Sequence, residues 1–235
     1  MKQLLILAAL IVLSESAVGQ LNLDKLKKTL SGESLSKEEI GEGLKEALTN
    51  GVSKGSDLVS QLDGYYKNPE IKIPFPSEVK QVETKLRQIG LGGEVDKFIE
   101  SLNRGAEDAA KEAKPIFVSA IKQMTIQDAW GILKGENDAA TKYLSRTTSP
   151  QLTEKFKPVI QNSLNKVNAT KYYSDLVNTY NKIPLVQKVN PNLDDYATEK
   201  AIQGLFVMVA KEEKNIRANP GARTTELLKK VFSAQ

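Results

Sequence analysis

The chain has 235 residues, 40% of them hydrophobic, which is enough for one good core, and no low-complexity linker divides it. Its net charge is +4, and the 33 basic and 29 acidic residues alternate along the chain, which is typical of a solvated surface and argues against a nucleic-acid partner. The chain contains neither histidine nor cysteine. This absence excludes the usual zinc sites, cysteine nucleophiles, Ser-His-Asp triads and Glu-x-x-His di-iron sites.

Other familiar site motifs are missing as well. The sequence has no Gly-x-Gly-x-x-Gly, no Walker loop and no Asp-x-Asp-x-Asp-Gly calcium loop. We therefore expect no metal and no cofactor. The chemistry that remains available is carboxylate chemistry, Ser/Lys pairs, or none at all.

The first residues are typical of a secretory signal peptide. Lys2 precedes an apolar run at 4–13, and a polar turn follows that ends in Ala17-Val18-Gly19. We expect cleavage near Gly19, which places the protein in the periplasm or outside the cell. A membrane anchor is the alternative, but a spanning helix needs about 20 apolar residues, and this run has ten. Because the chain has no cysteine, we do not expect a lipoprotein.

Three parts follow from this division. Residues 1–19 are the signal peptide, 20–35 are a polar arm that we expect to be loosely attached, and 36–235 are a single helical domain. Helical spacing of apolar residues dominates the third part. The expected fold is therefore all-α or nearly so, a multi-helix orthogonal or bundle domain.

The first helix of the domain begins with a capping box. Ser36 and Glu39 have the required spacing, and apolar residues follow at helical intervals to residue 62. Four glycines interrupt this helix. Either Gly51 and Gly55 let another backbone approach closely, or the helix breaks after Asn50.

Two proline-containing segments interrupt the helical pattern. Residues 68–76 include three prolines, which remove backbone donors and force an extended backbone, and residues 183–186 form a second such segment. We expect a short two-stranded ribbon near 71–75 and 183–187. Edge-like packing is the alternative, because proline is confined to the edges of sheets.

Apolar spacing predicts further helices along the chain. One runs from 79 to 89 and is stopped by Gly90, a second covers 94–113, and an amphipathic helix at 225–232 closes the chain.

Capping signals mark the starts of others. Thr125 with Asp128 begins a short helix, and Asn192 with Asp195 begins a long one. Ser149-Pro150 opens another long helix, because proline is favoured at the first helical position, where its missing N–H had no partner.

The helix after Asn192 is the most informative. Residues 204–210 are apolar in every direction around the axis, so we expect protein on all sides and a central place in the fold. Glu212 shares the apolar stripe of this helix and should be partly buried. Without a partner its pKa would rise, which would make Glu212 the candidate catalytic proton-transfer group. The other interpretation is an ion pair with a basic residue such as Arg146, Arg217 or Arg223.

Two more groups of residues have both a structural and a binding interpretation. On the helix at 94–113, Arg104 points away from the apolar stripe between Glu100 and Asp108, which favours a solvated salt-bridge ladder. Tyrosines gather beside the proline segments and at helix ends, where they line either a ligand cleft or the rim of the core. The candidate ligand-binding residues are Tyr66, Asn103, Arg146, Tyr173, Tyr180 and Arg223.

Many separate segments together resemble one family. They include Tyr65-Tyr66-Lys67-Asn68-Pro69, Ile71-Lys72-Ile73-Pro74, Ser101-Leu102-Asn103-Arg104, Lys114-Pro115-Ile116-Phe117, Ile121-Lys122-Gln123-Met124-Thr125, Tyr180-Asn181-Lys182-Ile183-Pro184 and Ala222-Arg223-Thr224-Thr225. In this order they look like the bacterial domain of unknown function 4197 family, from about residue 40 to 232. The resemblance implies an exported, mainly helical bacterial protein. It implies no reaction, ligand or catalytic residue.

Two classes of function remain. The first is a non-catalytic binding or interaction protein of the cell envelope, whose partner is a small amphipathic ligand, an envelope component or another protein, with at most peripheral membrane contact. The second is a carboxylate-dependent hydrolase or lyase that uses Glu212. An enzyme should place Glu212 in a concave pocket beside a second carboxylate or a lysine, and a binding protein need not.

Overall fold

The computed structural model describes residues 36–182, 184–185, 188–223 and 225–233. The expected signal peptide and arm lie outside the described residues. The described residues belong to one compact unit. No helix in this part of the chain is long and apolar enough to cross a membrane.

The described residues form helices and no strand, so the all-α fold class is confirmed. The elements in chain order are α2 Lys37–Val59, the 3-10 helix η1 Ser77–Val79, α3 Lys80–Gln88, α4 Gly92–Ala110, α5 Ala113–Lys122, α6 Ile126–Lys134, α7 Ala139–Asn165, α8 Ala169–Tyr180, α9 Leu193–Ala218, the 3-10 helix η2 Pro220–Ala222 and α10 Glu226–Ser233.

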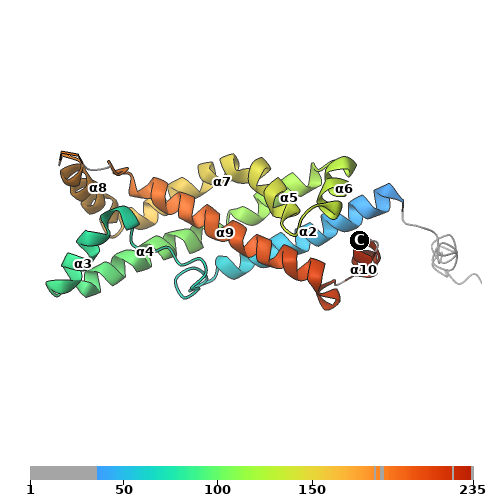
Figure 1. Ribbon diagram of the computed structural model, residues 1–235, viewed down its shortest axis with the longest axis horizontal. Helices are drawn as coiled ribbons and strands as arrows, with labels where there is room; N and C mark the ends of the chain where they lie inside the picture. The colour runs from blue at the N-terminus through green and yellow to red at the C-terminus, as the bar shows by residue number, and fades with distance from the viewer. Residues whose placement is uncertain (1–35, 183, 186–187, 224, 234–235) are drawn as a thin grey trace, which may run out of the picture. The chain divides into compact units, whose positions relative to one another are not determined.

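Helix α9 is the centre of the packing, as the sequence predicts. It contacts α7, α2, α4 and α8, and Figure 1 shows it crossing the domain between α7 and α2. Ala201, Leu205 and Val209 are buried on it. The expectation of protein on every side is wrong at Val207, which is 44% exposed, because the neighbouring helices leave one face of α9 open.

Helix α2 is continuous, so the predicted break after Asn50 is wrong. Its capping box is confirmed: the Ser36 hydroxyl accepts from the Glu39 N–H at 3.1 Å, and the Glu39 carboxylate accepts from the Ser36 N–H at 2.9 Å. A Cβ at Gly55 would lie 3.7 Å from the backbone nitrogen of Val209. This glycine therefore permits the close approach of α9, which offsets the cost of glycine within a helix.

Helix α7 corrects another expectation. Ser149-Pro150 does not open a helix, because α7 begins at Ala139 and contains both Pro150 and Pro158. Both prolines are exposed, so the backbone carbonyls that lose a partner face water. The buried stripe of the helix continues past both prolines from Leu144 to Leu164. Packing of this stripe against α4 and α9 outweighs the local preference of proline for a helix start.

The other helix boundaries follow local signals closely. Gly90 stops α3 with a φ of +88°, and the Thr125 capping box is confirmed, with bonds of 3.1 and 3.0 Å to Asp128. Asn192 takes the position before α9, but its side chain accepts no bond from the helix and instead donates to Asp195 at 3.3 Å.

The expected ribbon is wrong within the described residues. Residues 71–75 belong to no strand, and residues 183, 186 and 187 of the other half lie outside the description. The backbone of Ile73 is nevertheless paired, because a side chain takes the place of a neighbouring strand.

Candidate functional site

Asn103 on α4 is that side chain. It is fully buried, its amide nitrogen donates to the carbonyls of Ile73 at 2.9 Å and Ile99 at 2.7 Å, and its amide oxygen accepts from the Ile73 N–H at 2.8 Å. One amide thus satisfies both backbone groups of Ile73, which is what a β-strand partner would do. The segment after Tyr66 is thereby fixed against α4.

Glu107, one turn further along α4, fixes the start of the same segment. Its carboxylate accepts from the backbone N–H groups of Tyr65 and Tyr66, both at 3.1 Å. Arg104 donates to this carboxylate at 2.7 Å, so a nearly buried charge has both a counter-ion and hydrogen bonds. We call Asn103, Arg104 and Glu107 the polar clamp.

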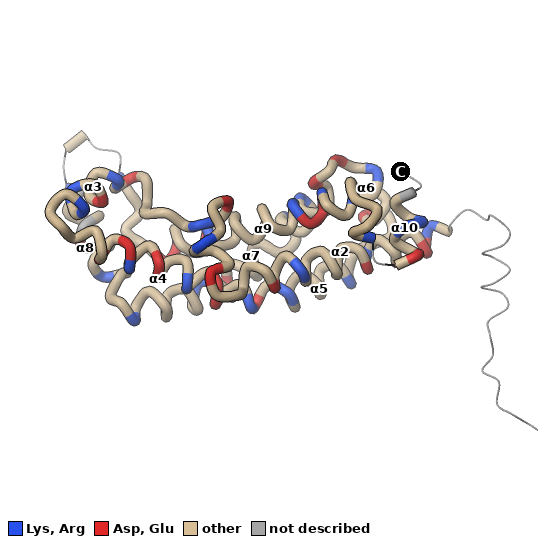
Figure 2. Tube along the Cα trace, turned by 90° about the horizontal axis from the view of Figure 1, so that it is seen from below, with Lys and Arg blue, Asp and Glu red and all other residues tan. Residues whose placement is uncertain are grey.

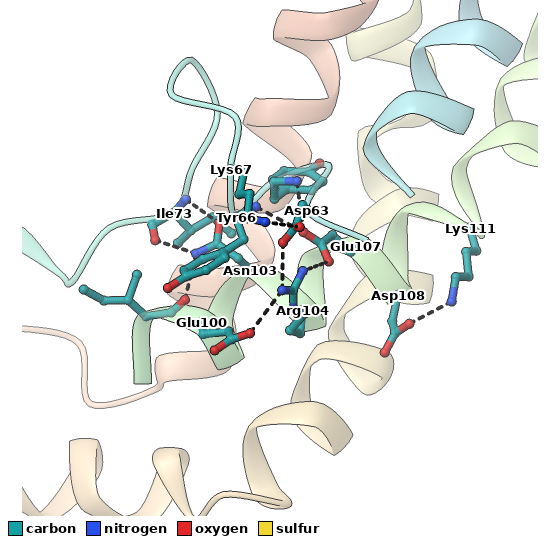
Figure 3. Close-up of polar contacts among 12 residues, drawn as sticks. Asp63, Tyr66, Lys67, Ile73, Glu100, Asn103, Arg104, Glu107, Asp108 and Lys111 are labelled. Atoms are coloured by element: carbon teal, nitrogen blue, oxygen red, sulfur yellow. Dashed lines mark hydrogen bonds and ion pairs between the residues drawn. The ribbon is translucent and has the colours of Figure 1, made fainter. Parts of the chain in front are cut away.

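Arg104 reaches beyond its own helix, which corrects the expected salt-bridge ladder. It pairs with Glu100 at 3.0 Å and with Asp63 at 2.8 Å, whereas Asp108 pairs with Lys111 instead. Figure 3 shows the guanidinium of Arg104 held between the three carboxylates. Hydrogen bonds to Glu107, Asp63 and Glu100 outweigh the effect of burial and raise the pKa of Arg104, so it remains charged.

Asp63 occupies an unusual backbone conformation, with a φ of +69°. Such a conformation is sparsely populated for residues other than glycine, although aspartate tolerates it better than most. Lys67 and Arg104 both bond to its carboxylate, and these bonds lower its pKa below 3.8. The turn after α2 is therefore anchored by charge at its most strained residue.

The polar clamp positions one wall of an apolar pocket. Phe75 lies two residues after the clamped Ile73, and its ring packs in a tilted arrangement against the ring of Phe98 on α4, with 5.0 Å between the ring centroids. The pocket has a volume of about 680 Å³. Segments from η1 to α4 and from the end of α7 to α8 supply its lining, which consists of Phe75, Val82, Leu86, Leu91, Glu94, Val95, Lys97, Phe98, Val167, Ala169, Tyr172 and Tyr173.

Among the described residues, two charged side chains line this pocket, and they neutralise each other. Lys97 and Glu94 form an ion pair at 3.0 Å, and both are largely exposed at the edge. Burial, and then the negative charge of Glu78, raises the pKa of Tyr173 to about 12, so its hydroxyl is neutral at physiological pH. The interior offers apolar contact and no acid–base pair. A volume in this range is typical of pockets for small organic ligands.

The structure separates most of the candidate binding residues. Only Tyr173 lines the apolar pocket. Asn103 belongs to the polar clamp, and Tyr66 lies beside the clamp, with Lys72 and Arg104 over its ring at 4.3 and 5.2 Å. The side chain of Tyr180 lies outside the described residues.

The two remaining arginines have structural contacts elsewhere. Arg146 lies over the ring of Tyr143 at 5.8 Å. Arg223 donates to the carbonyls of Ile216 and Arg217 at 3.2 and 2.9 Å, which satisfies backbone acceptors at the end of α9.

Glu212 is partly buried and pairs with a basic residue, as the ion-pair interpretation expects. The partner is Lys54 at 2.8 Å and not one of the three arginines named as examples. It does not line the apolar pocket. The more deeply buried ion pair belongs to the next residue, Glu213, which pairs with Arg217 at 2.9 Å. Glu213 also accepts from the first N–H groups of α7, and Arg217 donates to the last carbonyls of α6. This pair therefore caps the start of α7 and the end of α6, because it satisfies backbone groups that lack partners within their own helices.

Sequence reasoning allowed for a cleft lined by tyrosines, but it did not identify the other residues of the pocket or the role of Glu107. The available signal for Glu107 was its spacing of three residues from Arg104, which places the two side chains together on a helix. Within the described part of the chain, no group of three or more acidic side chains is arranged to hold a metal ion.

The fold and the pocket define a class: an all-α domain whose packed helices enclose an apolar cavity. A family model described as "Protein of unknown function (DUF4197)" matches residues 34–233. The chain belongs to this family, which confirms the resemblance seen in the sequence. No curated protein and no solved structure matches the chain.

Proposed function

We propose that this protein is an exported, non-catalytic binding protein of the cell envelope that takes a small amphipathic ligand into the apolar pocket. The observation that carries the proposal is the pocket itself, about 680 Å³ in volume and lined almost entirely by apolar side chains. An apolar chain that leaves water for such a cavity gains about 25 cal/mol for each Å² it buries. The polar end of the ligand remains at the open edge, near Lys97 and Glu94.

The alternative of a carboxylate-dependent enzyme lacks an equivalent observation. Glu212 is engaged by Lys54 on α2 and lies away from the pocket lining. The carboxylate that does line the pocket, Glu94, is exposed and paired with Lys97. These contacts favour binding over proton transfer.

A fluorescent fatty acid tests the proposal directly. We expect cis-parinaric acid, titrated into the protein in buffer, to bind saturably with an affinity in the micromolar range. Val82→Asp places a carboxylate in the pocket wall and should weaken binding about tenfold or more, because the ligand would bury an unpaired charge.

Val159→Asp is the matched control. Val159 is also a half-buried valine packed against the core, but it lies on α7 and does not line the pocket. The proposal fails if wild type shows no saturable binding, or if the two aspartate variants bind the probe equally well.

A further inference from the structure

The mouth of the apolar pocket has an unusually apolar rim. Leu91, Val167 and Tyr172 line the pocket and are also 43%, 52% and 68% exposed. Ile89 precedes Leu91 in the turn between α3 and α4 and is 71% exposed. We call these four residues the rim. Ile89 and Leu91 come from the turn between α3 and α4, whereas Val167 comes from the turn before α8 and Tyr172 from α8 itself. A cluster of large exposed apolar side chains around a cavity marks an interaction surface.

Unpaired positive charge flanks the rim. Lys166 and Lys171 are exposed and stand on either side of the turn that carries Val167, and no ion pair among the described residues includes either lysine. Acidic groups near the other turn are already neutralised, since Glu94 pairs with Lys97 and Asp96 pairs with Arg87. Figure 2 shows Lys or Arg positions along the tube around α8 and α3, together with Asp or Glu positions. The surface around the mouth therefore favours an anionic partner.

We propose that the rim docks on the surface of an anionic phospholipid bilayer, so that the pocket receives an acyl chain directly from the membrane. This inference rests on the proposed function and names the source of the ligand. Charge complementarity identifies the partner, because lysines beside exposed apolar side chains match phospholipid headgroups above an apolar layer. Tyr172 suits this position, since tyrosine favours the boundary between headgroups and hydrocarbon. Because the rim is continuous with the cavity, the acyl chain can pass from the bilayer into the pocket without exposure to water.

Vesicle flotation tests the electrostatic part of the inference. We expect wild type to float with vesicles of phosphatidylcholine and phosphatidylglycerol in a 3:1 ratio, and much less with pure phosphatidylcholine. A lysine near an anionic bilayer strengthens binding about fivefold, so Lys166→Gln with Lys171→Gln should weaken binding to the anionic vesicles about 30-fold. All proteins carry the same N-terminal residues, so any contribution of the apolar run at 4–13 cancels in the comparison.

The matched control is Lys122→Gln with Lys214→Gln. These lysines on α5 and α9 are also exposed, and none of the described ion pairs includes them. The control has the same net charge as the rim variant and should float like wild type. If both double variants lost the same amount of binding to the anionic vesicles, the loss would be explained by net charge alone, and the inference would be overturned.

Ile89→Ser separates docking from ligand binding. Ile89 belongs to the rim but does not line the pocket, so this variant should float less with anionic vesicles and bind cis-parinaric acid in buffer as wild type does. If the probe binds and neither the lysine nor the Ile89 variant changes flotation, membrane docking is wrong and the proposed function stands. If the probe does not bind, the proposed function itself is wrong.

Discussion

Replacement of Asn103 is the sharpest test of the polar clamp. Asn103→Ala removes three hydrogen bonds and leaves both the N–H and the carbonyl of buried Ile73 without their partner. A buried polar group left unsatisfied costs about 1–3 kcal/mol, so two such groups predict a loss of about 2–6 kcal/mol in the free energy of unfolding. A domain of this kind has a total of about 5–15 kcal/mol, so the loss is a large fraction of the stability.

Urea unfolding followed by circular dichroism measures this loss. Asn162→Ala is the control, because Asn162 is exposed on α7 and its removal should change the free energy of unfolding by less than about 0.5 kcal/mol. The slope of the unfolding free energy with urea should be the same in both variants, which shows that the folded state stays compact. A difference between the variants of less than about 1 kcal/mol would refute the reasoning, since Ile73 would then find another partner or water.

The same variant has a consequence at the pocket. Phe75 follows Ile73 closely and forms part of the pocket wall, so release of Ile73 should loosen that wall. We expect Asn103→Ala to weaken the binding of cis-parinaric acid. The measurement is made in buffer without urea, at a temperature at which the variant is still folded. Unchanged probe affinity would show that the clamp stabilises the fold without shaping the pocket.

Two further predictions concern the other ion pairs. Glu213→Gln should lower the free energy of unfolding by about 3 kcal/mol, because Arg217 would stay buried without its counter-ion. Glu212→Gln should lower it by less than about 1 kcal/mol, because its partner Lys54 is exposed. Equal losses of stability in thermal unfolding would contradict the difference in burial between the two pairs. Lys67 and then Arg104 lower the pKa of Asp63, so its contribution to stability is complete above the ordinary value of 3.8 and is lost as the pH falls through the lower folded-state pKa. We expect the free energy of unfolding, measured from about pH 5 down to about pH 2, to decline less steeply with falling pH in Asp63→Asn than in wild type.

Local signals in the sequence predicted the helix starts well. The capping boxes at Ser36 and Thr125 are correct because each involves residues only three positions apart, so distant packing has little influence on them. Pro150 misled for the opposite reason. Its preference for a helix start is local, but the buried stripe that carries α7 through it depends on α4 and α9.

The candidate site was harder to predict because its contacts are distant in sequence. Glu212 and Glu213 both lie within the width of the apolar stripe of α9, and what distinguishes them is the start of α7, which supplies the N–H groups that Glu213 binds across 73 residues. The expected ribbon shows the same limit. The sequence predicts that residues 71–75 are extended, but not that the amide of Asn103 is their partner.

The central place of α9 also has a consequence for the order of folding. Helix α2, at the start of the described domain, packs against α9 more than against any other single helix; α5 and α6 also contact it, and α10 packs against it as well. The apolar face of α2, the first helix of the described residues, is therefore fully covered only when α9 and α10 are present, and the ends of α6 and α7 lack their partners until Glu213 and Arg217 are present. The core of such a chain is not finished until α9 and α10 have been synthesised, because the contacts that close it have a large sequence separation. Such a delay is compatible with the export that we propose, because a polypeptide crosses a membrane through the secretory route before it folds.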